Sequence, residues 1–240
     1  MIEEYFKPLA LQIDSGFGST ADSFYSAAQA LESTQDHKYG FGMGGGKLPL
    51  LYLYRHCIEL YLKSAITLIE RLKPNHSDND EDVFPTIKEN GKNKKIFNVH
   101  SINTLFLNYL ETLERNKIFI KSRSGYDWFV IPKEISFLIE QVEKYDKNST
   151  MFRYPVTMDS NLDYEKSTFK KCVFENKEIV IDTKLKSKPN IFLLVQGDNN
   201  DIVESYVSDN DAVTEIHDVL KELASQLSGL HFGLTTDLIR

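Results

Sequence analysis

The sequence has few cysteines, since Cys57 and Cys172 are the only two in 240 residues. They lie far apart in apolar surroundings, which excludes a disulfide framework and predicts reduced, buried thiols in a cytoplasmic protein. The sequence also lacks a C-x-x-C pair and an H-E-x-x-H helix. It therefore offers no recognisable zinc site, and we expect neither a metal nor another cofactor.

A long uninterrupted hydrophobic run is also missing. The most apolar stretch is broken by Arg55, His56 and Glu59, so we expect no membrane span. The first ten residues, MIEEYFKPLA, lack the pattern of a signal peptide. The 28 Lys and Arg residues are outnumbered by 35 Asp and Glu, and the net charge is −7. This balance argues against non-specific coating of nucleic acid but permits a local basic site.

A glycine-rich run, YGFGMGGGK at residues 39–47, invites comparison with phosphate-binding loops. A Walker loop needs a glycine where Phe41 stands and a hydroxyl where Leu48 stands. Three of the glycines fit G-x-G-x-x-G, but that fingerprint has meaning only directly after a strand. A helical pattern and a polar loop precede this run, so we interpret it as a linker.

Apolar periodicity predicts helices at about 22–32, 49–72, 101–114, 132–146 and 211–230. A long polar loop is expected at 73–98, and residues 149–156 are expected to be extended. Two strands are predicted within 167–185 and a third within 190–197. The fold class expected is mainly α, a helical bundle with a small β-hairpin or sheet insertion before the C-terminal helix. Residues 1–160 would form the bundle, and residues 161–240 would form the insertion and last helix on the same domain.

The helix expected at 49–72 carries the most informative residues. Its first half is apolar nearly all round, which is typical of a buried helix. Arg55, His56, Glu59 and Lys63 nevertheless cluster within about 100° of arc. Glu59 is four residues from both Arg55 and Lys63, so the three can form a ladder. One interpretation is an ion network that joins helices, and another is a polar pocket for a phosphate or other anion. A metal bound by His56 and Glu59 is disfavoured because the adjacent cations would repel it.

Three more residues are candidates for the same site. Arg153, in the segment FRYP, would reach the Arg55–Glu59 cluster, and Tyr154 would stack or donate a hydrogen bond. The alternative is an aromatic clasp that covers the bundle. His100 precedes a predicted helix, where it would either cap the helix or meet a substrate.

Three segments in order, LPLLYLYRHCIELYLK, VHSINTLF and KYDKNSTMFRYPV, carry a family resemblance. They resemble uncharacterised bacterial proteins with an R-H-x-x-E-L-x-L-K string and an F-R-Y-P segment. These proteins look like distant members of the HEPN superfamily, and the resemblance covers about residues 20–160. It implies an up–down helical bundle, homodimers, and roles in RNA cleavage or defence against phage.

The chain departs from the catalytic pattern of that family, which is R-x(4–6)-H on one helix. The single match runs from Arg71 to His76 and is interrupted by Pro74. Arg55 and His56 are adjacent and point about 100° apart. The catalytic pair of the family therefore does not carry over residue by residue.

These observations lead us to expect an HEPN-like intracellular protein that handles RNA or a nucleotide, as a metal-independent endoribonuclease of phage defence or a toxin system. The catalytic candidates are His56 for proton transfer and Arg55 or Arg153 for the phosphate charge. Ligand-binding candidates share polar or cationic side chains: Glu59, Lys63, His100 and Tyr154. A homodimer through helical faces is expected. The alternatives are a non-catalytic module that binds a protein partner and a small-anion sensor.

Overall fold

A computed structural model describes residues 6–33, 47–72, 84–147, 149–175, 178–180, 185–209 and 211–239. Seven α-helices and six strands in two small sheets lie in this part of the chain, with 56% helix and 15% strand. The expectation of a mainly α bundle is therefore wrong, because the protein is mixed α/β. Two strands form within the segment taken as a polar loop, and one more forms just before the last helix.

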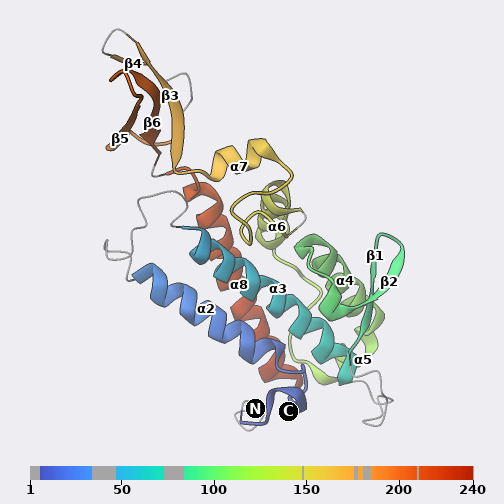
Figure 1. Ribbon diagram of the computed structural model, residues 1–240. Helices are drawn as coiled ribbons and strands as arrows, with labels where there is room; N and C mark the ends of the chain where they lie inside the picture. The colour runs from blue at the N-terminus through green and yellow to red at the C-terminus, as the bar shows by residue number, and fades with distance from the viewer. Residues whose placement is uncertain are drawn as a thin grey trace.

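Helix α3, Leu48–Arg71, runs through the centre of the helical body. It packs against α2 (Phe17–Ser33), α8 (Thr214–Leu238) and α4 (Ile102–Arg115), as Figure 1 shows. Every residue from 57 to 69 is buried. The prediction of a central helix at these residues is confirmed, and its near-continuous burial explains why its sequence is apolar on most sides.

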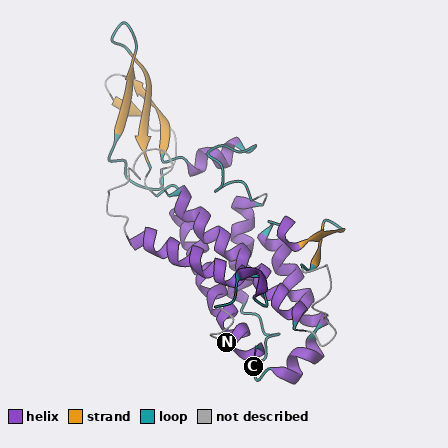
Figure 2. Cartoon of the chain, turned by 60° about the horizontal axis from the view of Figure 1, so that its bottom comes forward, coloured by secondary structure: helices purple, strands orange, loops and turns teal. Residues whose placement is uncertain are grey.

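Five further helical segments lie outside this central group in the described part of the chain. Helix α6 (Lys133–Asp146) packs on α4 and α8, and α5 (Lys117–Arg123) contacts both of the same helices. Helix α7 (Ser160–Lys166) and two 3₁₀ turns, η1 (Leu9–Leu11) and η2 (Ile96–Asn98), complete the set. Figure 2 shows the helices as one body with the strands outside it. Within the described residues, no helix has both the length and the apolar composition to cross a membrane.

A β-hairpin replaces part of the polar loop predicted at 73–98. Strands β1 (Thr86–Glu89) and β2 (Lys92–Lys95) pair antiparallel, with Thr86 opposite Lys95. Asn90 and Gly91 connect them with φ values of 51° and 74°, the left-handed conformation that a two-residue hairpin turn requires. Residues 73–83 of the predicted loop lie outside the described residues, as do residues 39–46 of the glycine run.

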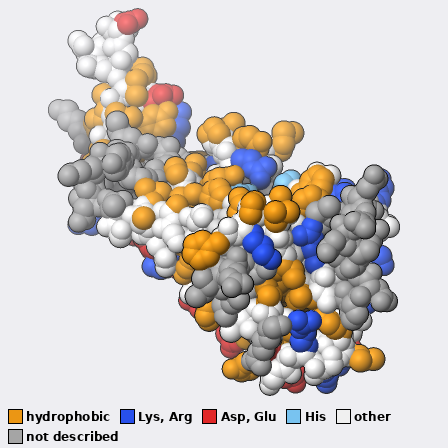
Figure 3. All heavy atoms as spheres, turned by 90° about the horizontal axis from the view of Figure 1, so that it is seen from below, with side chains coloured by type: hydrophobic (Ala, Val, Ile, Leu, Met, Phe, Trp, Pro, Cys, Tyr) orange, Lys and Arg blue, Asp and Glu red, His pale blue; other side chains and the backbone are white. Residues whose placement is uncertain are grey.

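The second sheet has four antiparallel strands in the order β4-β3-β6-β5 and projects from one end of the helical body (Figure 1). Its strands are β3 (Phe169–Glu175), β4 (Glu178–Val180), β5 (Phe192–Gln196) and β6 (Ile202–Ser208). The prediction placed the first three and missed β6. Hydrophobic side chains are visible on this projecting part as well as over the helical body in Figure 3.

The segment expected to be extended, 149–156, folds differently. Ser149 has a φ of 59°, and the backbone amides of Arg153 and Tyr154 both donate to the carbonyl of Thr150. The chain therefore turns there, and it buries Met151 and Phe152 against the helical core.

Candidate functional site

Arg55 is the centre of a buried polar cluster that joins three distant segments. Its Nε donates to Asp146 Oδ2 at 2.8 Å, and its Nη1 donates to Glu59. Its Nη2 donates to the His100 carbonyl and to the Ser149 hydroxyl. One guanidinium thus connects α3, the segment before α4 and the end of α6, using the planar fork of donors that distinguishes arginine from lysine.

Glu59 is the acceptor that the cations of α3 share. Its Oε1 accepts from Lys63 Nζ at 2.8 Å and lies 2.9 Å from Nδ1 of His100. The residue is only 1% exposed. Burial alone would raise the pKa of Glu59, but the hydrogen bond with His100 and the charges of Arg55 and Lys63 together hold that pKa well below its usual range.

The cluster is balanced and closed to solvent. Two cations, Arg55 and Lys63, face two carboxylates, Glu59 and Asp146, and all four residues are buried. The predicted ladder is therefore present, in the form of the ion network that joins helices. The sequence reasoning missed Asp146 and Ser149, although the apolar stripe of α6 ends beside Asp146. Arg55 contacts no open surface and cannot meet a ligand in this conformation.

His56 does not join this cluster. Its ring lies between Phe24, at 4.6 Å between centroids, and Tyr52, stacked at 5.5 Å. Its Nδ1 is buried and has no hydrogen-bond partner among the described residues. Burial lowers the pKa of His56, and the nearby cations lower it further while Glu59 opposes them. A half-buried imidazole that lies between two aromatic rings and resists protonation is poorly placed for proton transfer to a ligand.

Arg153 and Tyr154 are both exposed. Burial lowers the pKa of Lys63, and the charges of Arg55 and Arg153 lower it further while Glu59 opposes them, so Arg153 acts on the cluster from a distance. Within the described part of the chain, the Arg153 side chain makes no hydrogen bond or ion pair with it. The contact from this segment comes instead from the amide of Met151, which donates to Asp146 Oδ1 at 2.9 Å. The carbonyl of Tyr154 accepts from buried Lys166 at 3.0 Å. The FRYP segment therefore covers the core, as the aromatic-clasp alternative proposed.

Arg71, the arginine of the single R-x(4–6)-H match, has a structural role. Arg71 Nη1 donates to the carbonyls of Gln12 and Ile13 at 3.1 and 3.3 Å. Pro74 and His76 lie outside the described residues. Arg71 thus binds the turn that precedes α2.

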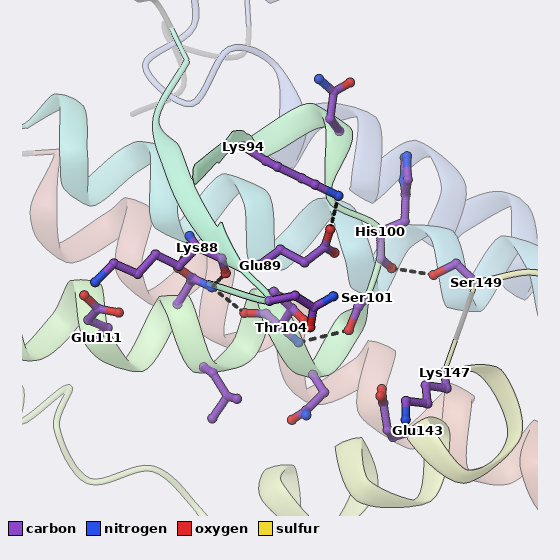
Figure 4. Close-up of a pocket in the computed structure, with 15 residues that line it drawn as sticks. Lys88, Glu89, Lys94, His100, Ser101, Thr104, Glu111, Glu143, Lys147 and Ser149 are labelled. Carbon is purple, nitrogen blue, oxygen red and sulfur yellow. Dashed lines mark hydrogen bonds and ion pairs between the residues drawn. The ribbon is translucent and has the colours of Figure 1, made fainter. Parts of the chain in front are cut away.

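An open cavity of about 750 Å³ lies beside the buried cluster, and we name it the His100 cleft. Figure 4 shows the β1–β2 hairpin with Lys88 and Lys94 on one side and the end of α6 with Glu143 and Lys147 on the other. His100 lies just before the N-cap of α4, with its carbonyl toward Ser149 and its ring pointing away from Glu143 and Lys147 in this view. The ligand-binding prediction for His100 thus coincides with a cleft, whereas the helix is capped by Ser101, whose Oγ accepts from the amide of Thr104.

His100 connects the cleft to the core. Its side chain is 45% exposed, yet its Nδ1 meets the buried carboxylate of Glu59. A carboxylate at one ring nitrogen favours the proton on that nitrogen and leaves Nε2 as an acceptor. Glu143, which also lines the cleft, has its pKa raised mainly by burial. The cleft thus contains two groups suited to proton transfer, and neither was predicted to be catalytic.

The cations of the cleft differ in their pairing. Lys94 pairs with Glu89. Lys88 and Lys147 have no ion pair among the described residues, so both amines can approach an anionic ligand. Burial raises the pKa of Glu143, and the nearby charge of Lys147 opposes that rise. Within the same residues, no group of three or more His, Cys, Asp and Glu side chains is placed to hold a metal ion.

Three comparisons were made, with models of protein families, with curated proteins and with solved structures, and none of them finds a match for this chain.

Proposed function

We propose that this chain is an HEPN-like protein that binds RNA in the His100 cleft and cleaves it without a metal ion. One observation carries the proposal: a histidine held by a buried carboxylate faces a polar cleft that contains unpaired lysines. Bound RNA would place phosphates near Lys88 and Lys147 and a ribose near His100. A ribonuclease of this kind would serve phage defence or act as a toxin.

The cleft supports a defined reaction. His100 Nε2 takes the proton of a ribose 2′-hydroxyl, and the 2′-oxygen attacks the adjacent phosphorus. The bond from phosphorus to the 5′-oxygen breaks, and that oxygen receives a proton from Glu143 or from the imidazolium. The products are a 2′,3′-cyclic phosphate and a 5′-hydroxyl. Lysine charges would stabilise the negative charge that builds on the phosphate.

This proposal moves both catalytic roles from the residues that the sequence suggested. His100 replaces His56, because His56 lies between two aromatic rings. Lysines of the cleft replace Arg55, because Arg55 is 3% exposed and all of its donor groups have partners. Glu59 and Lys63 then act as positioning residues, since they reach the cleft only through His100.

Purified protein incubated with single-stranded and hairpin RNA, with and without EDTA, tests the proposal. Cleavage should persist in EDTA and leave cyclic phosphate ends. His100→Ala should lower the rate by about two to four orders of magnitude, the usual share of acid–base catalysis. His100→Gln keeps a hydrogen-bond donor for Glu59, so it should be equally inactive but better folded. Cleavage that both variants retain would overturn the assignment.

Binding is measured separately by fluorescence anisotropy with labelled RNA. Lys147→Ala should weaken binding several-fold and reduce its salt dependence by about one charge, since each phosphate contact contributes to that slope. The matched control is Lys133→Ala, which removes an exposed lysine from the other end of α6. Equal effects of the two variants would argue against the cleft as the RNA site.

A second candidate is a non-catalytic module that binds a protein or a small anion. The observation that favours it is the balanced, closed ion network, which acts as scaffolding without any chemistry. In that case RNA would remain intact under every condition of the first experiment. Binding without cleavage, sensitive to Lys147→Ala, would select the anion-binding form of this candidate.

A further inference from the structure

Among the described residues, strand β5 lies at the edge of its sheet and is open to solvent. It is the outer strand of the order β4-β3-β6-β5, and all five of its residues are exposed. Four of them are large and apolar: Phe192, Leu193, Leu194 and Val195. Exposed edges are normally blunted by a lysine, a proline or a covering element. The sequence FLLVQ contains no charge and no proline.

Alternate residues of β5 have backbone groups with no hydrogen-bond partner among the described residues. The carbonyl of Ile191 accepts from the amide of Ser208, and the amide of Gly197 donates to the carbonyl of Asp201. The backbone groups of Ile191 and Gly197, which flank the strand, therefore point toward β6. Antiparallel strands alternate in this respect, so the backbone groups of Phe192 and Leu194 turn outward. The pairing with β6 shifts register between Val195 and Gln196, but the bond at Gly197 keeps the backbone of Gln196 outward as well.

Opposite charges flank the two ends of the strand. Lys188 precedes it, and Asp198 and Asp201 lie in the turn that follows it. All three are exposed, and none has an ion pair within the described residues. Two copies of β5 in antiparallel orientation would bring the basic end of each beside the acidic turn of the other. A parallel arrangement would bring like charges together instead.

We propose that β5 is a self-association surface on which a second copy of this chain pairs antiparallel, about a two-fold axis at Leu194. Phe192 of each copy then lies opposite Gln196 of the other, and the two Leu194 residues face each other. This register uses the three residues whose backbone groups are free. It continues the sheet across both copies and places the apolar side chains of the two β5 strands side by side. Such a closed, symmetric pair leaves no β5 edge for further addition.

Sedimentation velocity of the full chain without RNA tests this inference. At about 50 µM, well above the concentration at which a micromolar dimer dissociates, the wild type should be a dimer. Leu194→Lys places two like charges at the axis and should weaken dimerisation more than tenfold. Val180→Lys is the matched control, since Val180 is equally apolar and exposed but lies in β4 at the opposite edge. Circular dichroism confirms that both variants fold.

Charge exchange separates self-association from binding of a different partner. Lys188→Glu should weaken dimerisation about fivefold, because two exposed ion pairs are lost. Adding Asp198→Lys and Asp201→Lys to the same chain should restore it. A monomeric wild type at 50 µM would overturn the inference, and so would a dimer that Leu194→Lys leaves intact. RNA plays no part in these measurements, so their failure would leave the proposed ribonuclease standing.

Discussion

Nδ1 of His100 lies 2.9 Å from Oε1 of Glu59, although the two residues are 41 positions apart in the chain. The contact joins a carboxylate of the core to an imidazole in the wall of a surface cleft. Its consequences for stability and for chemistry can be measured separately, because Glu59 is buried and His100 is partly exposed.

Replacing Glu59 with glutamine should cost about 3 kcal/mol of unfolding free energy, because two buried cations lose their shared charge. Urea unfolding measures the change. Glu140→Gln is the control, since Glu140 lies exposed on α6 and should change stability by less than about 0.5 kcal/mol. Similar unfolding midpoints for the two variants would show that the ion pairs of Glu59 do not stabilise the fold.

Glu59 should also make the protein sensitive to acid. Its pKa is lowered in the folded state, so between that pKa and the ordinary value of 4.5 only the unfolded chain binds the proton. The stabilisation is fully present above pH 4.5 and is lost as pH falls through the folded pKa. Urea unfolding between pH 3 and 7 should show a shallower acid slope in Glu59→Gln than in the wild type, and equal slopes would contradict this linkage.

His56 should contribute a second pH dependence at higher pH. Burial lowers its pKa in the folded state, so stability falls as pH drops from about 6.5 toward that lowered pKa. His56→Phe removes the titration and fits an apolar ring between Phe24 and Tyr52. We expect this variant to match or exceed the wild type at pH 5.5 and to differ by less than about 1 kcal/mol at pH 7.5. A loss at both values would mean that the imidazole has a polar role.

The turn of the β1–β2 hairpin offers a comparison of two glycines. Gly91 has a φ of 74°, whereas Gly125 has no positive φ, and an added Cβ would meet nothing within 4 Å at either position. Gly91→Ala should therefore cost about 1 kcal/mol through backbone strain alone. Gly125→Ala should be neutral or slightly stabilising. Thermal unfolding of the two variants measures the difference, and equal melting temperatures would show that alanine is not strained at position 91.

The helical part of the fold could be predicted because its signals are local. Helix α3 was placed within one residue at each end, and the Arg55–Glu59–Lys63 ladder follows from its four-residue spacing. Helix α2 begins five residues earlier than predicted, where Asp14 accepts hydrogen bonds from the amides of Gly16 and Gly18. The pair Asn90-Gly91 favours a hairpin turn, but its segment is so polar that we expected a loop there.

The rest of the site could not be predicted from local patterns. Asp146 and Ser149 reach Arg55 from 91 and 94 positions away, and a single sequence does not say which distant segments meet. His100 was considered for two roles, but its direction became clear only with the position of Glu59. His56 shows the converse error: adjacency to Arg55 suggested a shared site, while one helical step turned its ring toward α2.

The bonds from Arg55 to the His100 carbonyl and the Ser149 hydroxyl have a consequence for how the cleft moves. If either hydrogen bond broke, the buried guanidinium would lose an acceptor that stabilises its charge. We therefore expect the wall of the cleft around His100 and Ser149 to resist local opening. Its amide hydrogens, that of Met151 included, should exchange with solvent only when the whole molecule unfolds. A ligand would then meet a surface that already has its final shape.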